Sequence, residues 1–326
     1  MADTDIDRDW LELVVLDAVR TGADTMLLRL GGGPAELPAY EPGAHVAVQC
    51  GGDMVRHYSL SGCGADRGVY ELGVKLDPET RGGSRWIFEH ARPASTLRVS
   101  APRNHFPLVG DAPAYLFLSG GIGITPIIAM LHALRRSNRR ARLVHLCRSR
   151  EQLAFADWLD ELAAFHDVHL HFDSEAGGVY DLQAELQRCP ADTEIYCCGP
   201  APMIAAVQEL AGRDGRADRL HVEFFAPPAA PDGADRDDCE FVVVQHRTGR
   251  RIPVPATKTM LAALRDAGFE MKSQCEYGVC GWCMVGVVDG EPAHFDSYLT
   301  AAEKAANKLV LPCVSRCAGT TLTLDI

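Results

Sequence analysis

The N-terminal third of the chain carries short, largely apolar runs with a strand-like pattern. Clusters of Gly and Pro separate these runs. The runs lie at residues 11–16, 25–30, 45–48, 70–74 and 96–99. Short strands at regular spacing favour a closed antiparallel sheet. We therefore expect a small antiparallel β-barrel over residues 1–108.

From residue 109 the pattern changes to strand, glycine-rich turn and helix. The apolar run 115–118 leads into Gly120, Gly121 and Gly123, and Thr125 and Pro126 are then expected as the N-cap and the first residue of a helix. Further strands are expected at 142–147, 168–172 and 194–198, with a helix at 153–166. This alternation predicts an α/β domain with a parallel sheet over 109–226, whose ligand lies at the carboxyl ends of the strands. The second turn at that edge is Cys198, Gly199 and Pro200.

Residues 227–238 are rich in Pro, Ala and Asp and have no periodic apolar pattern, so we interpret them as a linker. Beyond the linker, strand patterns at 241–244 and 251–254 precede a helix pattern at 260–264 and a cysteine-rich loop. This order resembles the β-grasp fold of ferredoxins. We therefore expect a third domain over residues 239–326.

The cysteine-rich loop has the spacing C-x4-C-x2-C, formed by Cys275, Cys280 and Cys283, and the more distant Cys313 follows. This is the plant-type [2Fe-2S] pattern, in which one loop supplies three thiolates and a separate segment the fourth. Gly278 and Gly281 let the loop backbone approach the cluster, because glycine tolerates positive φ. A structural zinc site is the competing interpretation, but such sites draw their ligands from two short C-x2-C-like pairs.

Two segments of the first domain have the residue types that hold a flavin phosphate. One is Arg56-His57-Tyr58-Ser59, and the other runs from Lys75 to the turn Gly82-Gly83-Ser84 and an apolar helix start. A helix N-terminus and an arginine fork both favour a phosphate. In this hypothesis Tyr58 packs flat on the isoalloxazine, Ser59 donates a hydrogen bond near its N5, and Arg56 meets the phosphate.

The composition excludes several classes of protein. Of the 326 residues 47% are apolar, which supports packed cores, while the apolar runs are too short to cross a bilayer. The net charge of -12 argues against nucleic acids and anionic membranes as partners. The N-terminal segment is acidic and lacks the apolar core of a secretion signal, so we expect a cytoplasmic protein whose 12 cysteines are reduced.

Taken in order, these motifs resemble the phthalate dioxygenase reductase family, whose relatives include vanillate O-demethylase reductases. The resemblance spans nearly the whole chain and includes the motif Glu223-Phe224-Phe225. It implies a flavin barrel, a nucleotide domain and a C-terminal [2Fe-2S] domain. It also implies FMN as the flavin, NADH as the donor and a Rieske-type oxygenase as the acceptor.

By position in this family, Cys198 is expected near the nicotinamide, and Phe225 is expected to pack beside the flavin. Ser59 and Cys198 are therefore the candidate catalytic residues, and Cys275, Cys280, Cys283 and Cys313 the candidate metal ligands. Cys197 and Cys317 match no such role and are expected to be structural. The residues expected to contact flavin or nucleotide are Arg56, His57, Tyr58, Ser59, Lys75, Gly82, Gly83, Ser84, Gly120, Gly121, Gly123, Thr125, Pro126, Cys198, Gly199, Pro200 and Phe225.

The combination has one chemical logic. A nicotinamide releases two electrons together as hydride, whereas an iron-sulfur cluster accepts one, so a flavin is needed between them.

The sequence leaves the identity of the nucleotide and of the flavin open. Arg148 and Arg150 follow the second strand of the nucleotide domain, where a 2′-phosphate of NADPH would lie. FAD remains an alternative to FMN, because nothing in the Gly82–Ser84 turn excludes an adenylate.

The acceptor is also open to alternatives, namely a free ferredoxin or another acceptor protein, or no acceptor at all in a redox-sensing module. A monomer is expected, because a fused electron chain needs no second copy. Two segments are candidates for the docking face, Arg316-Cys317 and Glu276-Tyr277.

Overall fold

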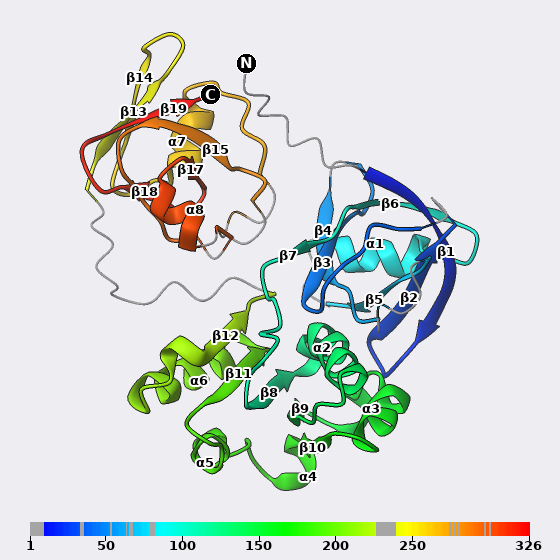
Figure 1. The fold of residues 1–326 in the computed structure, drawn as a ribbon. Coiled ribbons are helices and arrows are strands. Elements are labelled where there is room, and N and C mark those ends of the chain that lie inside the picture. The colour runs from blue at the N-terminus through cyan, green and yellow to red at the C-terminus, as the bar shows by residue number, and fades with distance from the viewer. Residues whose placement is uncertain are drawn as a thin grey trace. The chain divides into compact units, whose positions relative to one another are not determined.

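The computed structural model describes residues 10–32, 36–52, 54–62, 64, 68–77, 82–225, 239–273, 276, 278, 281–296, 298–299 and 301–326. The described chain forms two compact units, of residues 10–225 and residues 239–326 (Figure 1).

The first part of the larger unit is an antiparallel sheet in the order β4-β3-β6-β1-β2-β5, with β7 added to β3. Its elements are β1 (Trp10–Arg20), β2 (Thr25–Gly31), β3 (Ala44–Gln49), β4 (Val55–Ser59), β5 (Tyr70–Lys75), α1 (Gly83–His90), β6 (Thr96–Ser100) and β7 (Arg103–Asn104). A bridge between Leu60 and Leu72 joins the two ends of the sheet. The sheet therefore closes on itself around a core that includes Leu13, Leu28 and Val46, which are fully buried.

The second part is a parallel sheet in the order β10-β9-β8-β11-β12. Its strands are β8 (Ala114–Gly120), β9 (Arg142–Cys147), β10 (Asp167–Phe172), β11 (Thr193–Cys198) and β12 (Leu220–Glu223). Its helices are α2 (Ile124–Arg136), α3 (Ala156–Ala163), α4 (Asp173–Ala176), α5 (Leu182–Arg188) and α6 (Ala201–Arg213), with the short 3-10 turns η1 (Gly121–Gly123), η2 (Arg150–Gln152) and η3 (Ala217–Arg219). The strand order reverses between β8 and β11, and ligands of such sheets bind at that point.

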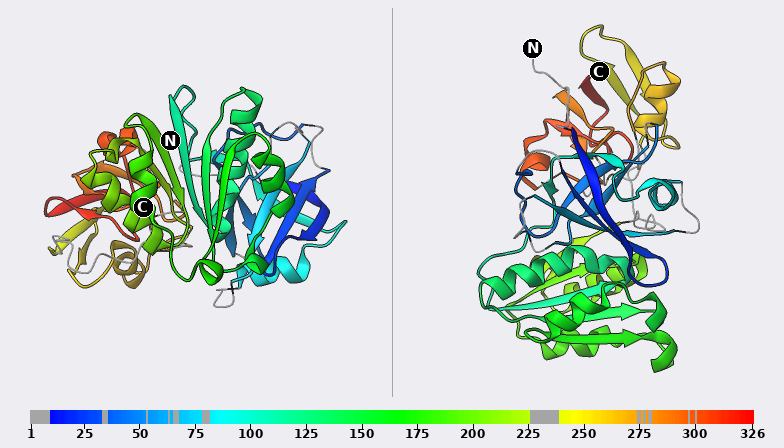
Figure 2. Two further views of the ribbon diagram at one scale, coloured as in Figure 1. Left: turned by 90° about the horizontal axis from the view of Figure 1, so that it is seen from below. Right: turned by 90° about the vertical axis from the view of Figure 1, so that its right-hand side faces the viewer.

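Alternate residues of these strands enter two separate cores. Phe117 and Cys198 pack with residues of α2 and α3, whereas Leu116 and Cys197 pack with residues of α5 and α6. Figures 1 and 2 show these helix pairs on opposite faces of the sheet. The architecture confirms the expected α/β domain. It also explains how the adjacent Cys197 and Cys198 come to lie in different surroundings, because successive strand residues point to opposite faces.

Two helix starts differ from the sequence-based expectation. Thr125 is not an N-cap, because η1 precedes α2 and Gly123 is the residue before the helix. The Thr125 hydroxyl donates instead to the Ile122 carbonyl oxygen, 2.9 Å away. The helix expected from residue 153 begins only at Ala156, because Phe155 has a left-handed backbone conformation with φ 60°.

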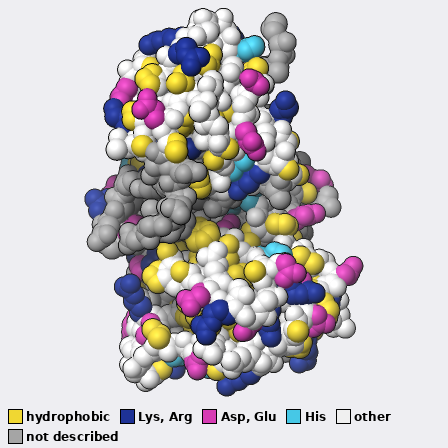
Figure 3. Space-filling model, turned by 90° about the vertical axis from the view of Figure 1, so that its left-hand side faces the viewer, with side chains coloured by type: hydrophobic (Ala, Val, Ile, Leu, Met, Phe, Trp, Pro, Cys, Tyr) yellow, Lys and Arg dark blue, Asp and Glu magenta, His cyan; other side chains and the backbone are white. Residues whose placement is uncertain are grey.

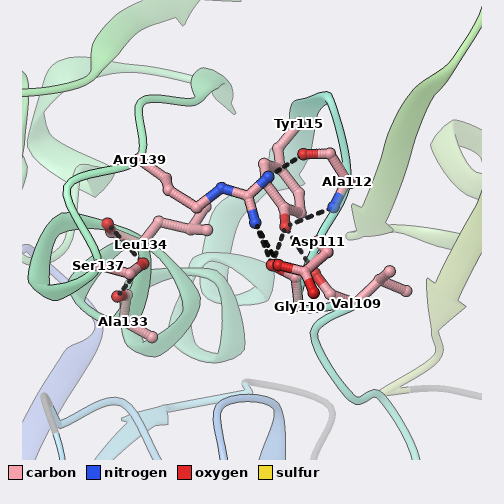
Figure 4. Close-up of polar contacts among 9 residues, drawn as sticks. All are labelled: Val109, Gly110, Asp111, Ala112, Tyr115, Ala133, Leu134, Ser137 and Arg139. Atoms are coloured by element: carbon pink, nitrogen blue, oxygen red, sulfur yellow. Dashed lines mark hydrogen bonds and ion pairs between the residues drawn. The ribbon is translucent and has the colours of Figure 1, made fainter.

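The segment that joins the barrel to the parallel sheet is held by side chains of the sheet domain (Figure 4). The Tyr115 hydroxyl donates to the carbonyl oxygen of Val109, 2.6 Å away, and accepts from the backbone N–H of Ala112 at 3.2 Å. The Arg139 guanidinium donates to the carbonyl oxygens of Gly110 and Ala112. Because these are backbone contacts, they fix the path of the connection between the two sheets.

The smaller unit has a mixed sheet in the order β14-β13-β19-β15-β17 and a separate pair, β16 and β18. Its elements are β13 (Phe241–Gln245), β14 (Arg251–Val254), α7 (Met260–Asp266), β15 (Val285–Asp289), β16 (Pro292–Ala293), α8 (Ala301–Ala306), β17 (Leu309–Val310), β18 (Arg316–Cys317) and β19 (Thr321–Asp325). A strand pair, a helix across the sheet and a parallel partner strand agree with the expected ferredoxin-like domain. Among the described residues of the chain, no helix is long and apolar enough to cross a membrane.

Candidate functional site

On the barrel, β4 brings Arg56 to the start of α1. A Cβ on Gly83 would lie 2.5 Å from Arg56 Cγ and 2.8 Å from Arg56 Nε, so the arginine stem occupies the space that a side chain would need. Gly82 is the N-cap residue of the helix, with φ 103°, and no side chain caps the first turn. The backbone N–H groups of the first helical turn and the Arg56 guanidinium therefore lie together. This is a pairing that suits a phosphate.

The neighbouring residues of the two predicted flavin segments are held by the barrel. The Ser84 hydroxyl accepts from the backbone N–H of Asp77 at 3.3 Å, which ties the helix start to the end of β5. Tyr58 packs against the barrel core, and burial raises its pKa. His57 pairs with Ala47 of β3, and its ring centroid lies 5.2 Å from that of His45.

The two glycine-rich turns of the parallel sheet pack directly on each other. A Cβ on Gly123 would lie 2.2 Å from the Cys198 carbonyl oxygen, and one on Gly199 would lie 3.0 Å from the Gly120 backbone nitrogen. A Cβ on Gly120 would meet Pro200 Cδ at 2.6 Å. These glycines are thus required by backbone contact between the turns. Gly121 has φ 53°, and a Cβ there would lie 3.8 Å from Lys75 Nζ, so this cation lies beside the turn.

Below the first turn, a buried polar chain joins β8 to β9. Ser119 Oγ lies 2.8 Å from His145 Nδ1, and His145 Nε2 lies 3.1 Å from Cys147 Sγ. Burial lowers the pKa of His145 to about 4 and raises that of Cys147 to about 11. Both side chains are therefore neutral near pH 7, and these side-chain contacts hold together the carboxyl ends of two adjacent strands.

Three side chains from different elements converge between the barrel and the parallel sheet. Cys198 Sγ lies 3.9 Å from Glu223 Oε2, and Ser59 lies close enough to lower the pKa of the Glu223 carboxyl. Burial outweighs that effect and raises the pKa of Glu223 to about 8. Apart from its interaction with Glu223, the buried Ser59 hydroxyl has no hydrogen-bond partner among the described residues. A hydroxyl donor, a thiol and a protonated carboxyl therefore face one place, and this arrangement fits a ligand that accepts a hydrogen bond from the hydroxyl there.

The remaining predicted residues flank this place. Thr125 and Pro126 are buried in the first turn of α2, and a Cβ on Gly73 of the barrel would lie 2.4 Å from Thr125 Cγ2. Phe225 is the second residue after β12, which ends at Glu223, and has 45% of its surface exposed. An exposed aromatic side chain next to the convergence point is available to a planar ligand.

In the smaller unit, Cys283 and Cys313 are both buried and belong to one apolar cluster with Leu261, Tyr298 and Leu311. Cys275 and Cys280 lie outside the described residues. Gly278 and Gly281 have φ of 75° and 70°, as expected for a loop that needs glycine. A Cβ on Gly281 would lie 2.3 Å from Tyr298 Cζ, so this glycine is also required by packing. Two buried thiols from separate segments fit a cluster whose ligands come from one loop and one distant cysteine.

The prediction that Arg316 and Cys317 form a docking face is wrong. Arg316 is only 6% exposed, and its guanidinium donates to the carbonyl oxygens of Lys258, Cys239 and Pro255 at 3.0–3.3 Å. Cys317 Sγ is also buried and donates to the Thr321 carbonyl oxygen. Glu276 is exposed and pairs with Arg265 at 2.8 Å, whereas Tyr277 lies outside the described residues.

Family models match two parts of the chain. Residues 117–209 match the oxidoreductase NAD-binding domain, and residues 243–318 match the 2Fe-2S iron-sulfur cluster binding domain. The vanillate O-demethylase oxidoreductase of Pseudomonas sp. strain HR199 is 39% identical over 96% of this chain and 99% of its own length. The solved structure of phthalate dioxygenase reductase is 32% identical, with a TM-score of 0.68 over 98% of both chains.

The chain belongs to the phthalate dioxygenase reductase family. It is an oxidoreductase with an NAD-binding domain and a [2Fe-2S] domain, and its relatives are reductase components of oxygenase systems. A type IV self-sufficient cytochrome P450 monooxygenase also matches this reductase, with 37% identity and a TM-score of 0.85 over 97% of the chain. The reductase spans 41% of that longer protein.

One residue of the convergence point is absent from the sequence-based set of site residues. Sequence reasoning places Glu223 only in the motif that ends at Phe225, although its carboxyl interacts with both Ser59 and Cys198. The signal that could have found it is its position at the end of a strand at the ligand-binding edge of the sheet.

On the surface drawn in Figure 3, acidic and basic side chains are interspersed.

Proposed function

We propose that this reductase passes electrons from NADH through FMN and the [2Fe-2S] cluster to a separate Rieske-type oxygenase. The observation that carries the proposal is the convergence of Ser59, Cys198 and Glu223 at the carboxyl edge of the parallel sheet. A flavin bound there accepts hydride and releases electrons singly, which is the chemistry that joins a nicotinamide to a cluster. No residue need act as a general acid or base for hydride transfer itself.

Each predicted residue has a proposed task. Arg56 and the Gly82–Ser84 turn bind the FMN phosphate, with His57 beside them on β4. Tyr58 would pack on the isoalloxazine, and the buried Ser59 hydroxyl would donate a hydrogen bond near its N5. On the nucleotide side, Gly120, Gly121, Gly123, Thr125 and Pro126 form the turn that receives the pyrophosphate, close to Lys75.

Cys198, Gly199 and Pro200 form the second turn, where the nicotinamide is placed beside the flavin. The protonated Glu223 carboxyl adds no negative charge near pH 7, because burial holds its pKa at about 8. Phe225 covers the outer side of the flavin, which would explain an exposed aromatic ring at this position. Cys275, Cys280, Cys283 and Cys313 are the proposed cluster ligands.

An anaerobic titration of the purified protein with NADH tests the proposal. Flavin and iron-sulfur absorbance are followed together in the visible spectrum. We expect both chromophores to bleach at a few equivalents of NADH, because both lie on one electron path. A protein without flavin, or one in which NADH bleaches the flavin and leaves an intact cluster oxidised, would contradict the proposed path.

The acceptor has a second candidate, a haem monooxygenase. The observation that favours it is the match to the type IV self-sufficient cytochrome P450, in which a chain of this kind makes up about two fifths of the protein. Stopped-flow reduction of a Rieske oxygenase component and of a P450 haem domain by the NADH-reduced protein distinguishes the two. Faster reduction of the Rieske protein is expected, because the full-length relative of 39% identity is a vanillate O-demethylase oxidoreductase.

We further propose a cytoplasmic monomer with domain limits at 1–108, 109–226, 227–238 and 239–326. The described cysteines outside the cluster set carry free thiols, which agrees with a reducing compartment. Light scattering after gel filtration tests the monomer. Limited proteolysis tests the linker, and cleavage within 227–238 that releases an intact iron-sulfur domain is the expected result.

A further inference from the structure

The loops that follow β9 and β10 lie side by side at the carboxyl edge of the parallel sheet. Phe172 at the end of β10 pairs with Cys147 at the end of β9, and the backbone N–H of Ser174 donates to the Arg148 carbonyl oxygen at 3.0 Å. Figure 1 shows α4 directly after β10 at this edge. Side chains of α4 therefore reach the residues that follow β9.

Arg150, in the loop after β9, is held by Glu175 of α4. Arg150 Nε lies 2.6 Å from Glu175 Oε1, and Arg150 Nη2 donates to Glu175 Oε2 at 2.9 Å. The same guanidinium lies over the Phe172 ring, 4.5 Å from its centroid. The two parallel contacts use the planar fork of the arginine on a carboxylate, which is the geometry that would otherwise receive a phosphate.

In dinucleotide-binding sheets, the loop after the strand next to the glycine-rich turn meets the adenosine ribose. An acidic side chain there accepts from the ribose 2′-hydroxyl of NADH, and an arginine accommodates the 2′-phosphate of NADPH. β9 is the neighbour of β8 in this sheet, so residues 148–151 occupy that place. The loops after β9 and β10 carry two cations, Arg148 and Arg150, and three carboxylates, Glu151, Asp173 and Glu175. Of these carboxylates, Glu175 pairs with Arg150, whereas Asp173 pairs with His171.

We propose that Glu175 is a specificity-determining residue that selects NADH over NADPH by occupying Arg150. The inference rests on the proposed function, because it assumes that the nucleotide domain binds a pyridine dinucleotide in the usual orientation. With Glu175 in place, a 2′-phosphate meets an arginine whose fork is already engaged and a carboxylate of like charge. Without it, Arg150 becomes a donor for the phosphate.

The test is steady-state reduction of ferricyanide by the full-length protein with NADH and with NADPH, for wild type and Glu175→Gln. We expect the ratio of kcat/KM for NADPH to kcat/KM for NADH to rise about fivefold, because an exposed ion pair is worth up to about 1 kcal/mol. The change should lie in the KM for NADPH, since the 2′-phosphate is remote from the hydride.

Two further variants keep the test specific. Glu175→Gln combined with Arg150→Gln should lose the gain in NADPH use, whereas a structural effect of Glu175 would not depend on Arg150. Glu161→Gln is the matched control, because Glu161 also pairs with an exposed arginine of this domain, Arg135, at 2.7 Å.

If the NADPH-to-NADH ratio of kcat/KM is unchanged in Glu175→Gln, or if its rise persists in the double variant, the inference is overturned. NADH turnover by the same protein shows in either case that the reductase works. Absence of NADH turnover in the wild-type protein would overturn the proposed function, and the inference with it.

Discussion

Cys198 Sγ lies 3.9 Å from Glu223 Oε2, at the point where the carboxyl ends of β11 and β12 pair. Burial raises the pKa of the Glu223 carboxyl to about 8, and the Cys198 thiol is likewise kept protonated by burial. The two groups that line the proposed hydride site are therefore neutral near pH 7.

The raised pKa of Glu223 predicts a pH-dependent stability. Between the ordinary value of 4.5 and about 8, the folded state holds a proton that the unfolded state has lost. The stability of the flavin-free protein should therefore fall as pH rises through this window. We expect the melting temperature of wild type minus that of Glu223→Gln to fall by several degrees between pH 5 and pH 8.5. A difference that stays constant with pH would show that Glu223 does not titrate in this window.

The contact between Gly83 and Arg56 predicts a coupled loss of flavin affinity. A Cβ on Gly83 would lie 2.5 Å from Arg56 Cγ, so Gly83→Ala should displace the arginine and weaken FMN binding about tenfold. Arg56→Gln should have a similar effect, and the double variant should lose little more than either single one. Fluorescence titration with FMN measures the affinity. Gly178→Ala, with open space around its Cβ, is the control, and full additivity would contradict the coupling.

Alanine substitution of two glycines in the parallel-sheet domain should change the stability of the protein in opposite directions. A Cβ on Gly123 would lie 2.2 Å from the Cys198 carbonyl oxygen, and the backbone of Cys198 and Gly199 leaves it no room. Gly123→Ala should therefore destabilise the protein by about 1–3 kcal/mol and raise the KM for NADH. Gly212 of α6 has open space, so Gly212→Ala should stabilise by about 0.5 kcal/mol. Urea unfolding measures both, and equal effects would mean that contact between the turns is unimportant.

The cysteines of the smaller unit predict a selective loss of the cluster. Cys313→Ser should abolish the iron-sulfur absorbance and retain the flavin, because Cys313 belongs to the proposed ligand set. Cys317→Ser is the matched control, since Cys317 is also buried but donates to the Thr321 carbonyl oxygen in a different apolar cluster. Visible spectra and iron analysis give the result. Loss of the cluster in both variants would argue that the site depends on folding of the unit and not on the specific ligand.

The burial of Arg316 predicts a role in stability. Three carbonyl oxygens accept from its guanidinium within 3.3 Å, so Arg316→Gln should destabilise the smaller unit by about 3 kcal/mol. Arg247→Gln should change little, because Arg247 is 76% exposed beside Asp325. Thermal melting followed at the iron-sulfur absorbance compares them. A slower acceptor reduction by Arg316→Gln with unchanged melting would restore Arg316 to the docking face.

Much of the reductase was readable from the sequence, because the relevant signals are local. The spacing of Cys275, Cys280 and Cys283 predicts a single loop around an iron-sulfur cluster. The glycines at 120, 123 and 199 mark turns, and the alternation of strand and helix marks a parallel sheet. Each of these depends on residues close to one another in the chain, so periodicity and composition are enough to reveal them.

Only the tertiary structure decided which side chains meet. Glu223 joins Ser59 and Cys198 because the β11–β12 register and the packing of the sheet against the barrel place it there. Arg150 pairs with Glu175 because α4 follows a strand adjacent to β9. Arg316 is buried although arginine is usually a surface residue. Contacts between residues far apart in the chain follow from the path of the backbone, and no local pattern of residues encodes that path by itself.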